Sequence, residues 1–325
     1  MPYSLCVLGC GTMGVSILSG VIESLKQQEG LQVTSSVPKT SLAESHPDVH
    51  VPAEDTIPNR FITCVSRPES AWKLKKRWEE LGRDDIEVLV SDNVRGVAEC
   101  NVILLGIQII LRHKVANLKW QRDVLGAPGM QEALSDKLLI SILAGTTTRQ
   151  LQSFVPASTR VVRAMPNTPC QIREGMTILS ALSPDCPFTS QTQAILLALF
   201  TPISRCRFLD EKHFDACTAV SASGPAFCLV ILEAIADGGV MMGLPRAEAL
   251  ELAAQAMQGA ARMSLQTGLH PAALKDSVTT PAGCTIAGLL AMEDGRIRST
   301  IARAIQTATL HAAGLGGAPK PTLKD

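Results

Sequence analysis

The chain has 325 residues, of which 46% are hydrophobic and 18% are charged, so it can bury a large core, and its length favours two domains. Thirty basic residues balance 30 acidic ones, and nothing in this charge indicates nucleic acid or an anionic membrane as a partner. A small neutral or singly charged ligand fits better.

Ten cysteines are scattered along the chain, without any Cys-x-x-Cys spacing and without a secretory leader before them. We therefore expect reduced thiols in a cytoplasmic protein rather than a disulfide framework. The six histidines show no ligand spacing, because His46 and His50 flank Pro47 in a segment too broken for one helix face. No metal site is predicted.

A glycine-rich turn follows the first apolar run. Residues 5–8 suit a strand buried on both faces, and they lead directly into Gly9-Cys10-Gly11-Thr12-Met13-Gly14 and then a helix-like segment. Gly9 permits a tight turn, Gly11 lets the backbone approach a pyrophosphate, and Gly14 lets the helix pack on the strand. The pattern predicts a dinucleotide site, the alternative being a glycine-rich turn in another kind of α/β protein.

The next segment, residues 27–59, is rich in Ser, Pro, Asp and Glu and has little periodicity, so we interpret it as a surface insertion. The predicted second strand is 61–65, with 31–34 as a weaker alternative. Ser66 and Arg67 follow it in place of the acidic residue that binds a ribose 2′-hydroxyl. They suit a 2′-phosphate, which favours NADP over NAD. Four nearby basic residues are interpreted as a solvated helix face: Lys73, Lys75, Lys76 and Arg77.

Further apolar runs recur at 86–90, 102–107, 138–143 and 159–162, separated by helix-like or loop stretches. This alternation predicts a doubly wound parallel sheet. Two last strands are expected at 175–180 and 205–209, on either side of a helix that begins at Thr189 or Ser190. The nucleotide-binding domain is therefore expected to span residues 1–210.

Residues 211–325 show helix signals only, with helix starts near Pro225 and Pro245. Small residues crowd these helices and allow close approach between them. The apolar run 216–232 is interrupted by Ser221 and Pro225 and is followed by Glu233, so it predicts a core or interface helix rather than a membrane span. We expect an all-helical domain that forms a dimer, the alternative being a self-sufficient bundle.

A turn between two of these helices carries the sequence Thr279-Thr280-Pro281-Ala282-Gly283-Cys284-Thr285-Ile286-Ala287-Gly288-Leu289. Pro281 and Gly283 break the chain, and a new helix is expected from Cys284, where unpaired N–H groups point outward. This turn is either a site for a small carboxylate or an ordinary capped loop.

Three stretches together resemble the pyrroline-5-carboxylate reductases: Met165-Pro166-Asn167-Thr168-Pro169 with Glu174-Gly175, then Ser221-Ala222-Ser223-Gly224-Pro225-Ala226-Phe227, then 276–289, which matches the family's signature. Order and spacing agree along the chain except at 27–59. The resemblance implies a Rossmann-type sheet followed by an all-α dimerisation domain. It also implies NADPH-dependent reduction of the cyclic imine 1-pyrroline-5-carboxylate to L-proline, the last step of proline synthesis, by a homodimer or a higher oligomer, with NADH as the weaker coenzyme.

The resemblance also implies roles for individual residues. The family's cofactor contacts fall on Gly9, Cys10, Gly11, Thr12, Met13, Gly14, Ser66, Arg67, Asn93, Gly106, Ile107, Gln108, Ile142, Leu143, Ala144 and Ser277. Its substrate contacts fall on Glu211, Cys284 and Thr285. Thr285 is the expected catalytic residue, because its hydroxyl could steady the substrate carboxylate or the imine nitrogen.

Two positions depart from the family pattern. The chain has Gly106-Ile107-Gln108-Ile109 where the family has Ala-Val-Lys-Pro, so a cofactor-side lysine is missing. It also has Ala282 where the signature has a glycine, and a positive φ there would strain the loop.

The sequence is also compatible with three other functions. An NADP-dependent 3-hydroxyacid dehydrogenase needs a lysine in its long helix, and residues 223–242 contain none. A non-catalytic NADP-binding sensor could keep the fold without turnover. A reductase of the six-membered imine is closer, since one methylene in an apolar pocket discriminates by only about 1–3 kcal/mol.

Overall fold

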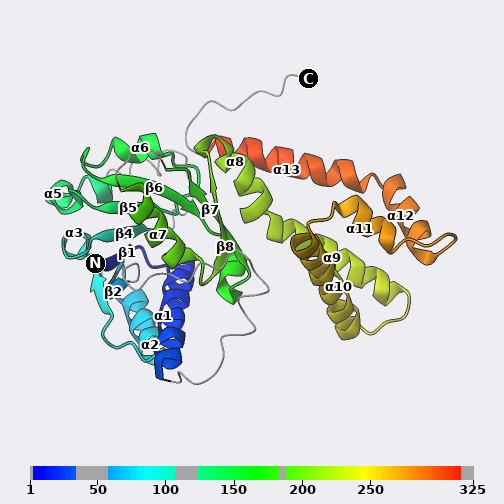
Figure 1. The fold of residues 1–325 in the computed structure, drawn as a ribbon, viewed down its shortest axis with the longest axis horizontal. Coiled ribbons are helices and arrows are strands. Elements are labelled where there is room, and N and C mark those ends of the chain that lie inside the picture. The colour runs from blue at the N-terminus through cyan, green and yellow to red at the C-terminus, as the bar shows by residue number, and fades with distance from the viewer. Residues whose placement is uncertain (1–2, 34–57, 107–122, 183–187, 316–325) are drawn as a thin grey trace. The chain divides into compact units, whose positions relative to one another are not determined.

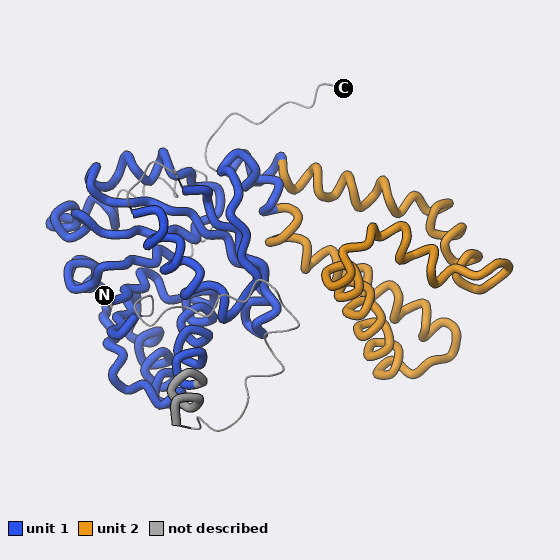
Figure 2. Tube along the Cα trace, viewed as in Figure 1, with its two compact units in different colours: residues 1–218, 310–325 blue, residues 219–309 orange. Residues whose placement is uncertain are grey.

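The computed structural model describes residues 3–33, 58–106, 123–182 and 188–315, and for residues 27–33 it describes the backbone. The chain forms two compact units (Figure 2): unit 1 comprises Met1–Thr218 and Leu310–Asp325, and unit 2 comprises Ala219–Thr309.

Unit 1 is built on one eight-stranded sheet (Figure 1), in the order β3-β2-β1-β4-β5-β6-β7-β8. Its strands are β1 (Tyr3–Leu8), β2 (Pro58–Val65), β3 (Glu87–Val90), β4 (Val102–Leu105), β5 (Leu138–Ser141), β6 (Arg160–Met165), β7 (Gly175–Ser180) and β8 (Ser204–Leu209). Every pair is parallel except β6 with β7. The predicted doubly wound fold is confirmed, with this one antiparallel junction added.

Two apolar layers cover the two faces of this sheet. One contains side chains from α1 (Thr12–Val33), α2 (Pro68–Glu80) and α7 (Thr189–Phe200), among them the fully buried Ile17, Trp78 and Phe200. The other contains side chains from α3 (Asn93–Ala98), α5 (Met130–Leu134) and α6 (Thr148–Gln152). The central strands are buried on both faces, which explains why their sequences read as unbroken apolar runs.

The ends of the predicted surface insertion belong to regular elements. Helix α1 continues through Gln27 to Val33, and β2 already begins at Pro58. The weaker alternative of a strand at 31–34 is wrong, because Leu31 to Val33 are helical. Residues 34–57 lie outside the part of the chain that the structure describes.

Unit 2 is helical, as predicted, and has a very small core of its own. Its helices are α9 (Gly224–Met241), α10 (Arg246–Thr267), α11 (Pro271–Ser277), α12 (Cys284–Asp294) and most of α13 (Ile297–Ala313). The buried cluster in this unit consists of Ala236, Ala249 and Ala253. Many large apolar side chains are exposed, including Leu229, Val230, Ile235, Met241, Leu252, Leu265 and Leu290. Three buried alanines stabilise little, so these surfaces need cover from outside the unit.

One helical stretch among the described residues, Glu211–Met241, is long and apolar enough to span a membrane, with a mean hydropathy of 1.8 over its most apolar window. A single helix of this kind is weak evidence for a span, because helices that pack in cores or interfaces have the same length and composition.

Candidate active site

The register of the sheet brings several predicted cofactor residues to one edge. Leu8 of β1 pairs with Cys64 of β2 and with Leu105 of β4, which in turn pairs with Ser141 of β5. Because these strands are parallel, their carboxyl ends share an edge, and the chain order reverses there between β1 and β4. Such a switch point is where open α/β sheets bind their ligands.

The glycine loop has the geometry that a dinucleotide needs. Gly9 has φ 76°, and its N–H donates to the carbonyl of Cys64 at 2.9 Å. A Cβ on Gly14 would lie 3.1 Å from Cγ1 of Val7, so glycine permits the helix to pack on the strand. A Cβ on Gly11 would meet no atom of the described residues within 4 Å. The described residues therefore leave the face of Gly11 open, and the pyrophosphate contact at this position stays a prediction.

The electrostatics of this loop suit an anion. Helix α1 begins at Thr12, so its first N–H groups and its positive dipole end lie at the loop. Cys10 is buried beside them, and burial raises the pKa of its thiol to about 12. The thiol is thus neutral at physiological pH and does not repel a phosphate.

The neighbouring strand ends carry the other predicted cofactor residues of unit 1. Ser66 and Arg67 follow β2 and are exposed, with Arg67 at the N-cap of α2. Asn93 begins α3 just after β3. Gly106 donates its N–H to the Leu8 carbonyl, and Ile142 donates to the Leu105 carbonyl.

Gly106 also lies close to the glycine loop, since a Cβ there would be 3.5 Å from the Gly9 carbonyl oxygen. Leu143 is buried and Ala144 is exposed directly after it. Two predicted contacts, Ile107 and Gln108, lie outside the described residues. The other cofactor contacts predicted in unit 1 lie at this edge of the sheet. Asn93 follows β3, the strand beside β2.

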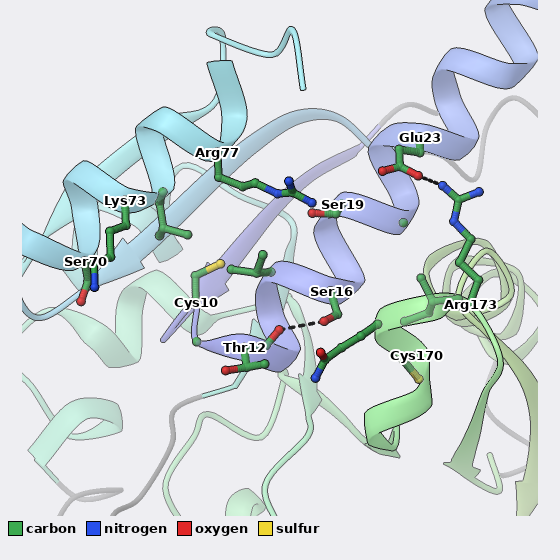
Figure 3. Close-up of a pocket in the computed structure, with 16 residues that line it drawn as sticks. Cys10, Thr12, Ser16, Ser19, Glu23, Ser70, Lys73, Arg77, Cys170 and Arg173 are labelled. Atoms are coloured by element: carbon green, nitrogen blue, oxygen red, sulfur yellow. Dashed lines mark hydrogen bonds and ion pairs between the residues drawn. The ribbon is translucent and has the colours of Figure 1, made fainter. Parts of the chain in front are cut away.

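A groove of about 570 Å³ extends from the glycine loop along α1 (Figure 3). Its lining includes Ser16, Ser19 and Glu23 from α1, Lys73 and Arg77 from α2, and Arg173 of the turn after η2 (Thr168–Ile172). Lys73 and Arg77 are exposed, in agreement with a solvated helix face, and both also line this groove. Lys75 and Lys76 are exposed, and Lys76 lies over the Trp72 ring.

These lining residues were not selected from the sequence. The signal that could have found them is their spacing: Ser16, Ser19 and Glu23 lie three and four residues apart on one side of α1, and Lys73 and Arg77 lie four apart on α2. Both spacings place side chains on one helix face.

Glu211, a predicted substrate contact, begins η3 (Glu211–His213) and lies in unit 1. Its Oε1 accepts hydrogen bonds from Nη1 of Arg163 and from the N–H of Thr148, both at 2.7 Å. The guanidinium of Arg163 also lies 4.5 Å from the centroid of the Phe214 ring. The carboxylate thus joins β6 and the start of α6 to the segment that follows β8.

The signature turn lies in unit 2, and its backbone shows the predicted strain. The N–H of Gly283 donates to the carbonyl of Thr280 at 3.1 Å, which closes a turn with Pro281 second and Ala282 third. Ala282 has φ 56°, in the left-handed region that a turn normally reserves for glycine. Helix α12 begins at Cys284, as predicted, with Gly283 as its N-cap.

Replacing Ala282 with glycine is expected to stabilise the protein by about 0.5–1 kcal/mol. Left-handed backbone costs an alanine roughly 1–2 kcal/mol, whereas the greater freedom of glycine in the unfolded chain offsets about 0.4–1 kcal/mol of the gain. Urea denaturation measures this difference. Ala287→Gly inside α12 is the control and should instead destabilise by about 1 kcal/mol; equal losses for both variants would contradict strain at Ala282.

The hydroxyl groups around this turn differ in what they contact. Ser277 donates to the Leu274 carbonyl and Thr279 to the Lys275 carbonyl, both at 2.7 Å. Thr285 has no hydrogen-bond partner for its hydroxyl among the described residues, and no side chain caps α12. Thr285 therefore does not act as a helix cap here, and its hydroxyl is available to a ligand.

Within the described part of the chain, no group of three or more His, Cys, Asp or Glu side chains is placed to hold a metal ion.

The chain is similar to known proteins of one family. Residues 211–315 match the family model for pyrroline-5-carboxylate reductase dimerisation. A Schizosaccharomyces pombe protein named pyrroline-5-carboxylate reductase is 45% identical over 316 residues, which cover 96% of this chain and 98% of that protein. One from Lophium arboricola is 42% identical over 96% of this chain and 93% of its own.

Solved structures show the same fold. A Coxiella burnetii pyrroline-5-carboxylate reductase has a TM-score of 0.71 at 24% identity, with 97% of this chain and 99% of the other covered. A Plasmodium falciparum pyrroline carboxylate reductase solved with NADP bound has a TM-score of 0.70 at 22% identity, with 97% and 98% covered. The full-length similarity to the S. pombe and L. arboricola proteins shows more than the fold: this chain belongs to the pyrroline-5-carboxylate reductase family.

Proposed function

We propose that this protein reduces 1-pyrroline-5-carboxylate to L-proline with NADPH, the last step of proline biosynthesis. The observation that carries this function is its 45% identity to a pyrroline-5-carboxylate reductase over nearly the whole of both chains. No similarity of this kind supports a 3-hydroxyacid dehydrogenase or a non-catalytic sensor. The six-membered imine remains the alternative substrate to be tested.

The residues at the sheet edge fit the coenzyme. Gly11 leaves open space for a pyrophosphate, and the start of α1 supplies N–H groups next to a neutral Cys10 thiol. When bound, NADPH supplies a hydride for the imine carbon. The protein's own part is to bind, orient and shield, because an imine can take its proton from water and needs no strong general acid.

The 2′-phosphate is proposed to lie at Ser66 and Arg67. Both are exposed at the end of β2, and Arg67 can form charge-assisted hydrogen bonds with a phosphate. Asn93, Gly106, Ile107, Gln108, Ile142, Leu143, Ala144 and Ser277 are proposed as the further coenzyme contacts.

Arg67→Ala is expected to raise the KM for NADPH about tenfold or more and to change the KM for NADH little, because only NADPH carries the 2′-phosphate. Steady-state kinetics with both coenzymes measures this. Lys75→Ala, an exposed lysine of the same helix, is the control. Equal effects of Arg67→Ala on both coenzymes would remove Arg67 from the phosphate site.

The substrate carboxylate is proposed to bind at the turn of 279–289, through the N–H groups of Cys284 and Thr285 and the Thr285 hydroxyl. The unpartnered hydroxyl and the first turn of α12 support this role. Glu211 is also proposed as a substrate contact. Its carboxylate already accepts hydrogen bonds from Arg163 and from the Thr148 N–H.

Thr285→Ala is expected to lower kcat/KM for the imine by about 10–100-fold, the loss of one hydrogen bond to a charged group, while NADPH binding stays intact. Initial rates and NADPH titration measure the two effects. Thr285→Ser retains the hydroxyl and should keep most of the activity. Unchanged imine kinetics in Thr285→Ala would exclude a substrate role.

Rates with the five-membered and six-membered imine carboxylates, each with NADPH and NADH, test the choice of substrate. The proposed function predicts the highest kcat/KM for 1-pyrroline-5-carboxylate with NADPH. A higher value for the six-membered ring would replace it with the alternative reductase.

We also propose a homodimer through a helical dimerisation domain of residues 211–325, after a coenzyme-binding domain of residues 1–210. The end of β8 at Leu209 and the family match from residue 211 support this boundary. The small alanine core and the many exposed apolar side chains of unit 2 support the dimer. The free cysteines of the described residues accord with a reducing compartment such as the cytoplasm.

A further inference from the structure

The groove beside α1 extends well beyond the glycine loop. Ser19 lies seven residues after Thr12, which is about 10 Å farther along the helix axis, and Glu23 lies about 16 Å farther. A pyrophosphate at the amino end of α1 contacts the loop and the first turn. The far part of the groove, lined by Ser19, Glu23, Arg77 and Arg173, is left without an assigned ligand.

Two hydrogen-bonding groups, Ser19 and Arg77, lie in this far part of the groove. Ser19 is 8% exposed, and its Oγ has no hydrogen-bond partner among the described residues. In Figure 3 the guanidinium of Arg77 points toward Ser19. The nearest carboxylate oxygen recorded for Arg77 is Oε2 of Glu80, at 3.9 Å, on an exposed side chain. An oxygen ligand between Ser19 and Arg77 would accept hydrogen bonds from both.

The charge of the lining favours an anion with two charges. Glu23 is the acidic residue of the lining, and it forms an ion pair with Arg173. The charges of Lys73 and Arg77 are therefore not balanced within the groove. A phosphate group matches two cations and offers several acceptor oxygens, whereas a simple carboxylate carries one charge.

We propose that Ser19 and Arg77, with Lys73 nearby, bind the phosphate group of a small molecule at a site separate from that of the coenzyme. The Arg77 guanidinium and the Ser19 hydroxyl donate to the phosphate oxygens. Lys73 contributes charge from the same side of α2. The lining of the groove also includes the apolar Val15, Leu74 and Ile203.

Isothermal titration calorimetry on the full chain tests this site. Inorganic phosphate is titrated into protein without NADPH and into protein saturated with NADPH, in a buffer without phosphate and at constant ionic strength. Glycerol phosphate replaces it in a second arm, and acetate in a third. Arg77→Gln and Ser19→Ala are compared with Lys75→Gln, an exposed lysine of α2 that is absent from the groove lining. The melting temperature and NADPH affinity of each variant verify its fold.

We expect phosphate to bind also when NADPH is bound. Binding should be roughly tenfold weaker in Arg77→Gln and weaker in Ser19→Ala. The affinity of Lys75→Gln for phosphate should equal that of the unaltered chain. Tighter binding of glycerol phosphate than of the free ion would identify a phosphorylated small molecule as the ligand, and equal binding would identify phosphate itself. Loss of binding once NADPH is present, equal binding in Arg77→Gln and the unaltered chain, or equal affinity for acetate would each overturn the proposal.

Discussion

Gly11→Ala is expected to raise the dissociation constant for NADPH by about 10–100-fold while the protein remains folded. No atom of the described residues lies within 4 Å of the added methyl group, so the substitution meets no obstacle in the described part of unit 1. The methyl would instead hold a pyrophosphate away from the N–H groups of the loop, and each hydrogen bond lost to a charged group costs about 1.5–3 kcal/mol.

Fluorescence titration with NADPH and urea denaturation separate these two effects. Gly14→Ala is the matched control, because its Cβ would lie 3.1 Å from Cγ1 of Val7. That variant should lose stability of about 1 kcal/mol or more through overpacking. A dissociation constant for Gly11→Ala equal to that of the unaltered chain would show that this loop does not hold the coenzyme.

Glu211→Ala is expected to lower the free energy of unfolding by about 2–3 kcal/mol. The change removes both hydrogen bonds to Oε1 and leaves the Arg163 guanidinium, whose side chain is 7% exposed, without its carboxylate. Breaking a buried ion pair costs about 3–5 kcal/mol, and the 32% exposure of the Glu211 side chain reduces that loss.

Urea denaturation of Glu211→Ala and Glu211→Gln measures how much the Glu211 contacts contribute to the free energy of unfolding. The glutamine keeps an acceptor for the Thr148 N–H and for Arg163 without the charge, so it should retain part of the lost stability. A loss under 0.5 kcal/mol for the alanine variant, set against the estimate of about 2–3 kcal/mol, would show that the contacts of Glu211 do not stabilise the fold.

Local chemistry was enough to predict the parts of the fold that depend on neighbouring residues. The turn at Gly9, the start of α12 at Cys284 and the strain at Ala282 follow from what Gly, Pro and Ala permit at a given φ. The strands were found because an unbroken apolar run suits a strand buried on both faces. The antiparallel pairing of β6 with β7 was not predicted, because the sequence of a strand does not show in which direction its neighbour runs.

Features that depend on distant residues could not be predicted. The extension of α1 to Val33 was missed because residues 27–30 carry no helical apolar stripe. Arg163 and Glu211 are 48 positions apart, and no local pattern connects them. Lys73 and Arg77 resemble a solvated face until α2 is placed beside the groove along α1.

The central claim is that this chain turns over 1-pyrroline-5-carboxylate with NADPH. The most direct measurement follows NADPH oxidation and L-proline formation together, with purified protein and the five-membered imine. We predict one L-proline formed for each NADPH oxidised, at a rate far above that without protein. Protein that is folded and binds NADPH, yet forms no L-proline above background, would contradict the claim.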